Sequence, residues 1–152
     1  MNDRPPALSS LPLGLIVAGA TTGALIAIGH RLGSTGLAFS AIAAALLRRH
    51  ATTSTPSLVV VGVGLHVVLT LCWTALFVSL VQLRRLKPIT AALLVAVLAN
   101  ALSWLIARTT GGGLASVLPL GDRIVFAVVF AASLAIGIRF AFSTSRGPAT
   151  LL

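Results

Sequence analysis

The feature that most constrains this chain is a set of four long apolar segments, each without a charged residue until its last few positions. They cover residues 11–29, 58–83, 89–107 and 124–142. Each approaches or exceeds the roughly 20 residues that a helix needs to cross the hydrocarbon core of a bilayer. Helices satisfy their backbone polar groups internally, and the alternating pattern of barrel strands is missing from the sequence. The sequence therefore predicts an all-α integral membrane protein, a bundle of four or five transmembrane helices with short loops, in one domain over residues 1–152.

The composition excludes a soluble domain. Hydrophobic residues make up 57% of the 152 positions and charged residues 9%, whereas a soluble domain carries roughly 25% charged residues. The net charge of +9 comes from basic residues between the apolar segments, so we expect contact with the lipid bilayer and no nucleic-acid binding. Ten arginines against one lysine, with abundant alanine, valine and glycine, indicate a bacterial chain from a GC-rich genome. We therefore expect the bacterial cytoplasmic (inner) membrane.

Two stretches allow more than one interpretation. The first apolar segment resembles a cleavable signal peptide in its small residues at 18–20, but its apolar run continues well past them, which favours a retained helix. Residues 32–47 are apolar but short, and they end in Arg48, Arg49 and His50. Stretches of this length are often interfacial or re-entrant, which is the placement we favour. A short fifth span and a continuation of the first helix are the alternatives.

The basic residues indicate an orientation and the membrane anchors. Arg84, Arg85 and Lys87 form the shortest and most basic connection, which the positive-inside rule places in the cytoplasm. The C-terminus is then cytoplasmic with either four or five spans, whereas the side of the N-terminus depends on that number. These three residues, together with Arg48 and Arg49, are the predicted membrane anchors.

Small residues at spacings of four predict where helices pack closely. A buried Asn100 is expected to make an interhelical hydrogen bond in the same way. The packing partner is either another helix of this chain or a helix of another protein, in a homo- or hetero-oligomer. The predicted packing positions are Gly19, Gly23, Ala27, Gly29, Gly33, Asn100, Ala127, Ala131 and Ala135.

His66 is the polar residue of most interest, because it lies deep in the second apolar segment. Helical spacing places Leu69, Thr70 and Trp73 on its side of the helix. The interpretation we favour is a histidine that steadies helix packing through a hydrogen bond, so no cofactor is expected. The alternatives are a proton-handling role and haem ligation by its neutral imidazole, with His30 as the second ligand.

No catalytic or metal-binding constellation is predicted. Asp122 is expected to cap the last helix and Arg123 to anchor it at the headgroups. The turn Gly33-Ser34-Thr35-Gly36 lies near His30, but there is no acid nearby to orient that histidine, so a serine nucleophile is rejected. Phosphate-cradling loops, zinc-protease motifs and paired carboxylates are absent from the sequence.

These observations favour a non-catalytic membrane protein, an accessory, assembly or structural subunit that works by helix packing. A haem-binding electron-transfer or assembly protein that uses His66 is the first alternative. A small transporter or channel, with Asn100 and His66 along a polar path, is the second.

Overall fold

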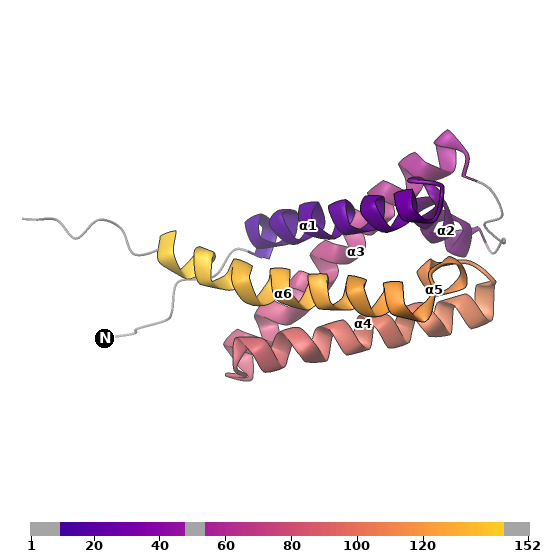
Figure 1. Cartoon of the computed structure of the whole chain (residues 1–152). Coiled ribbons are helices and arrows are strands. Elements are labelled where there is room, and N and C mark those ends of the chain that lie inside the picture. The colour runs from indigo at the N-terminus through magenta and orange to yellow at the C-terminus, as the bar shows by residue number, and fades with distance from the viewer. Residues whose placement is uncertain (1–9, 48–53, 145–152) are drawn as a thin grey trace, which may run out of the picture.

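The computed structural model describes residues 10–47 and 54–144, with the side chains up to Arg139, and these residues form only helices (Figure 1). Arg48 and Arg49, two of the predicted membrane anchors, and the neighbouring His50 lie outside the described residues. The four long helices are α1 (Ser10–Arg31), α3 (Pro56–Leu83), α4 (Pro88–Thr110) and α6 (Leu120–Thr144), and the two short ones are α2 (Leu37–Leu46) and α5 (Leu114–Val117).

The four long helices match the predicted transmembrane bundle. All four are long and apolar enough to cross a membrane. The shortest, α1, has 22 residues, which corresponds to about 33 Å against a hydrocarbon core of about 30 Å. Leu13, Val17 and Leu25 of α1 are buried in the protein. The first apolar segment thus packs as part of the bundle, and its retention in the mature protein stays a prediction.

The four long helices follow one another around the bundle in the order α1, α3, α4 and α6, and α3 also packs extensively against α2. One apolar core lies toward the α3–α4 turn and includes Phe77, Val95 and Leu134. A second core lies at the opposite end and includes Leu25 and Phe39. In Figure 1 the start of α1, the α3–α4 turn and the end of α6 share one end of the bundle. The connection between α4 and α6 lies at the other end, as four antiparallel crossings require.

The helix starts differ from the predicted boundaries by up to four residues. Pro56 and Pro88 open α3 and α4, because proline lacks an N–H that a first turn would leave unpaired. Helix α6 begins at Leu120 instead of residue 124, and the carbonyl of Pro119 accepts the hydrogen bond from the backbone N–H of Arg123. The expectation that Asp122 caps this helix is therefore wrong, since Asp122 already lies in its first turn.

Helix α2 is the element that the sequence left ambiguous. Its ten residues correspond to about 15 Å, half of the hydrocarbon core, so it is too short for a fifth span. Seven of these residues, 38–44, are buried in the protein. Gly62 of α3 lies directly under the carbonyl of Phe39, and Gly112 lies against the backbone of Ala45. Helix α2 thus crosses from α3 to the connection between α4 and α5, held by close backbone contacts at both ends.

Candidate functional site

One cavity lies between α3, α4 and α6, on the side where α2 and α5 pack. Its volume is about 160 Å³, and its lining is mostly apolar. We call it the α3–α4 cavity, because Leu69 of α3 and Leu102 of α4 both line it and are 45% and 42% exposed. Exposed leucines in the middle of spanning helices face lipid, so the cavity reaches the lipid-facing surface between these two helices. Its polar lining residues are His66, Thr70, Asn100, Ser103 and Arg123.

His66 is buried and bridges α3 to α1. Its Nε2 lies 3.0 Å from Oγ1 of Thr21. With the Thr21 hydroxyl donating to the carbonyl of Val17, the tautomer that completes this contact carries the hydrogen on Nε2 and donates it to Thr21. Phe39 and Phe126 flank the ring, with centroids 6.0 and 6.3 Å away. A neutral imidazole with a hydrogen on Nε2 has an acceptor at Nδ1, and Nδ1 has no hydrogen-bond partner among the described residues.

The face of α3 around His66 follows the predicted helical spacing. Leu69, Thr70 and Trp73 line the same cavity as His66. The Thr70 hydroxyl donates to the carbonyl of His66 at 2.8 Å, which satisfies that hydroxyl within its own helix. The α3 wall is therefore a mostly apolar surface, and Nδ1 of His66 is a polar atom on it without a partner among the described residues.

Asn100 of α4 and Arg123 of α6 lie side by side in the lining of the cavity. An Nη2 hydrogen of Arg123 is donated to Oδ1 of Asn100 at 3.3 Å. Nε of Arg123 is buried without a partner among the described residues. The expectation that Arg123 anchors the last helix at the headgroups is therefore replaced by an inward placement. Since Asn100 accepts with its oxygen, its NH₂ group remains as a donor.

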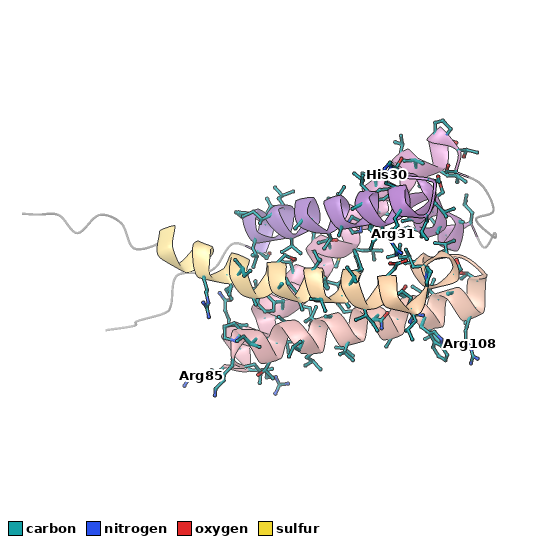
Figure 2. All side chains as sticks on the ribbon, viewed as in Figure 1. His30, Arg31, Arg85 and Arg108 are labelled. Atoms are coloured by element: carbon teal, nitrogen blue, oxygen red, sulfur yellow. The ribbon has the colours of Figure 1, made fainter. Side chains whose placement is uncertain are left out.

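An ion pair between α1 and α6 lies beside Arg123. Arg31 at the end of α1 pairs with Asp122 at the start of α6, and Figure 2 shows Arg31 beside the start of α6. The Asp122 side chain is 9% exposed, whereas that of Arg31 is 63% exposed. The sequence analysis missed this pair because 91 positions separate the two residues. The sequence did contain one indication of such a pair, because it has two acids and ten arginines, so several arginines are possible partners for Asp122.

The two histidines proposed as haem ligands lie in different places. His30 is exposed at the end of α1 (Figure 2) and lines a separate surface pocket with Ser34 and Ser54. His66 lines the α3–α4 cavity, and its Nε2 is occupied by Thr21. The structure therefore does not bring the two together around one cavity. Haem ligation by His66 stays a prediction, and no group of three metal-binding side chains occurs among the described residues.

The predicted packing positions on α1 and α6 divide into an inner set on α6 and an outer set on α1. Ala127, Ala131 and Ala135 of α6 face inward, with Ala127 at the cavity and the other two in the core. On α1, Gly19, Gly23 and Ala27 are exposed, and a side chain at either glycine would meet nothing within 4 Å.

The two glycines at the end of α1 act locally. Gly29 lies against the backbone of Ser34 and Thr35. Gly33 has a φ of 84°, a left-handed conformation that favours glycine. Both shape the turn toward α2.

The predicted anchors that the structure describes lie at one end of the bundle. Arg84, Arg85 and Lys87 are exposed in the α3–α4 turn, and Figure 2 shows Arg85 at the end opposite His30, Arg31 and Arg108. The guanidinium of Arg108 stacks over the Trp104 ring at 4.4 Å. This pair is a typical interfacial anchor that uses both an aromatic ring and a cation.

Comparison with protein-family models, with curated proteins and with solved structures gave no match.

Proposed function

We propose that the protein binds a small amphipathic molecule from the lipid phase in the α3–α4 cavity. The observation that supports this proposal is the convergence of His66, Asn100 and Arg123 on one apolar cavity. These residues come from three different helices, and each has polar atoms without partners among the described residues. Intramembrane polar groups are costly and face functional interiors far more often than lipid.

The rim and the lining of the cavity support entry from the bilayer. Leu69 and Leu102 are partly exposed where the cavity reaches the surface of the bundle. Phe126 and Phe130 line its wall on α6. A molecule with an apolar chain gains burial against these residues, while its polar end meets the three polar side chains. An apolar site with a few placed polar groups is the usual composition of a small-molecule pocket.

Native mass spectrometry of the gently purified protein tests this proposal. Ala99 lines the cavity, whereas Ala101, two residues along α4, is exposed. Wild type and Ala101→Phe are expected to retain a lipid-soluble adduct that Ala99→Phe, which fills the cavity, loses. Far-UV circular dichroism and size-exclusion chromatography establish that both variants fold. Equal retention of the adduct by two folded variants would contradict the proposal.

We also propose the bacterial inner membrane as the location, with the α3–α4 turn and the C-terminus in the cytoplasm. The exposed cluster of Arg84, Arg85 and Lys87 supports this orientation through the positive-inside rule.

A second candidate function is a non-catalytic subunit that packs against a partner helix. It is supported by the outer set of small residues on α1. Gly19 and Gly23 leave that surface open, and small residues allow close backbone approach in lipid. Cross-linking in the membrane tests it with Gly23→Leu, and Gly64→Leu is the matched control because Gly64 of α3 is equally open. Only Gly23→Leu is expected to abolish a cross-linked oligomer. The absence of any cross-linked species in wild type would rule out this function.

A further inference from the structure

We infer that the molecule bound in the α3–α4 cavity is an anionic amphiphile, an apolar chain that ends in a carboxylate or phosphate. Arg123 and Asn100 bind the acid group, and the chain leaves between Leu69 and Leu102 into the lipid. This inference rests on the proposed function and names the class of molecule that the cavity takes.

The charge balance around the cavity favours an anion. Arg123 is the one charged residue among its described lining residues. The neighbouring carboxylate of Asp122 is paired with Arg31 through Oδ1, and its buried Oδ2 has no partner among the described residues, so Arg31, Asp122 and Arg123 together carry one positive charge in excess. A charge within a transmembrane bundle usually pairs with an opposite charge or with dipoles. Asn100 supplies only a dipole, and an acid group would complete the neutralisation.

The available hydrogen-bond donors also favour an acid group. A guanidinium has five N–H donors in a planar fork that suits the oxygens of a carboxylate or phosphate. Arg123 donates one hydrogen bond, to Asn100, among the described residues. The NH₂ group of Asn100 lies beside this contact and provides a further donor. Donors from α4 and α6 thus converge on one place, which selects acceptor-rich groups over amines.

The opposite wall, on α3, supplies few acceptors. Nδ1 of His66 has no partner among the described residues, while Nε2 is engaged with Thr21, and the Thr70 hydroxyl oxygen can also accept. Few acceptors facing two sets of donors match a partly protonated phosphate or an acid group with an attached water. An ammonium group would need several acceptors and would meet Arg123 as a like charge.

The size of the cavity indicates how much of the molecule is enclosed. Its volume of about 160 Å³ is close to that of an engineered cavity of about 150 Å³ that holds one benzene molecule. A whole lipid therefore does not fit, but an acid group with its first carbons does. The remaining chain has an exit where the rim residues Leu69 and Leu102 are exposed. The apolar lining disfavours a free inorganic anion, which would lose its hydration with no chain to bury.

Tryptophan fluorescence tests the inference at the site itself. Trp73 lines the cavity and Trp104 does not, so a Trp104→Phe variant leaves one reporter. The protein in an uncharged detergent is titrated with a medium-chain ω-bromo fatty acid and with the matching alcohol, alkyl phosphate and alkyl amine. The acid or the phosphate is expected to quench Trp73 saturably, at a concentration at least about tenfold below that of the alcohol, as a charge-assisted hydrogen bond predicts. Tighter binding of the acid than of the phosphate indicates a fatty acid as the source of the ligand. Tighter binding of the phosphate indicates a phospholipid.

Variants of two arginines locate the effect. Arg123→Gln is expected to remove the preference for the acid over the alcohol, whereas Arg108→Gln, at an exposed position over Trp104, is expected to keep it. Equal quenching by acid and alcohol, or tighter binding of the amine, would overturn the inference and leave the proposed function intact. Absence of saturable quenching by all four compounds would overturn both. The wild-type comparison of acid with alcohol decides the inference even if Arg123→Gln does not fold.

Discussion

At the scale of single residues, the bundle contains few polar side chains, and three pairs of them join separate helices: His66 with Thr21, Arg123 with Asn100, and Arg31 with Asp122. Nε2 of His66 forms a hydrogen bond with Oγ1 of Thr21 across two helices, a contact that contributes about 0.6 kcal/mol on average in a membrane bundle. In the tautomer that carries its hydrogen on Nε2, this contact also leaves Nδ1 as an acceptor. The sequence predicted the residues that share the face of His66, since helical spacing alone determines them. It did not predict Thr21 as the partner of His66, or Arg123 as the partner of Asn100, because those contacts depend on how separate helices pack.

The ion pair between Arg31 and Asp122 leads to an asymmetric prediction. Arg31→Gln leaves a nearly buried carboxylate without its partner, which is expected to lower the free energy of unfolding by about 1–3 kcal/mol. Asp122→Asn is expected to cost less, because the guanidinium of Arg31 is largely exposed and stays solvated. Denaturant unfolding in detergent micelles measures both. The double variant should be more stable than Arg31→Gln alone, and the reverse order of the two single variants would contradict this explanation.

At the scale of elements, α2 depends on glycines that its own sequence does not contain. Gly62 lies under the carbonyl of Phe39, and Gly112 lies against Ala44 and Ala45. The N–H of Gly113 donates to the carbonyl of Ala41 at 2.7 Å. The four long helices could be predicted from length and hydropathy. The placement of α2 could not, because ten apolar residues suit an interfacial, re-entrant or buried helix equally well.

Two glycines of α3 test the contact with α2. Gly62→Ala places a methyl group against the backbone of Phe39, where no flexible side chain can move aside. Such overpacking is expected to lower the free energy of unfolding by about 1–3 kcal/mol. Gly64→Ala makes the same change at an open position of the same helix, and it is expected to be neutral or slightly stabilising because alanine favours helices. Thermal unfolding followed by circular dichroism compares the two. Equal stability of both variants would show that α2 does not pack closely on α3.

At the scale of the whole molecule, the four long helices bring the α3–α4 turn and the end of α6 to one side of the membrane. This topology is tested by thiol labelling in a Cys72→Ser background, since Cys72 is the only cysteine of the chain. Lys87→Cys is expected to react with a membrane-impermeant maleimide only after the inner membrane is opened, because the basic turn is proposed to be cytoplasmic. Thr109→Cys, at the other end of α4, is expected to react in intact spheroplasts. The opposite pattern would invert the orientation, and equal labelling of both would contradict the crossing of α4.

The central claim is that the α3–α4 cavity takes up an amphiphile from the lipid phase, and its most direct test uses the two tryptophans of the chain. Trp73 lines the cavity, whereas Trp104 is 45% exposed on the outer surface. The measurement is the intermolecular nuclear Overhauser effect from each indole N–H to an added protonated amphiphile, in deuterated detergent. We predict saturable contacts from the Trp73 indole to the amphiphile, and these contacts disappear in Ala99→Phe. Contacts from the Trp104 indole are expected neither to saturate nor to change in Ala99→Phe. Identical behaviour of the two indoles would contradict the claim.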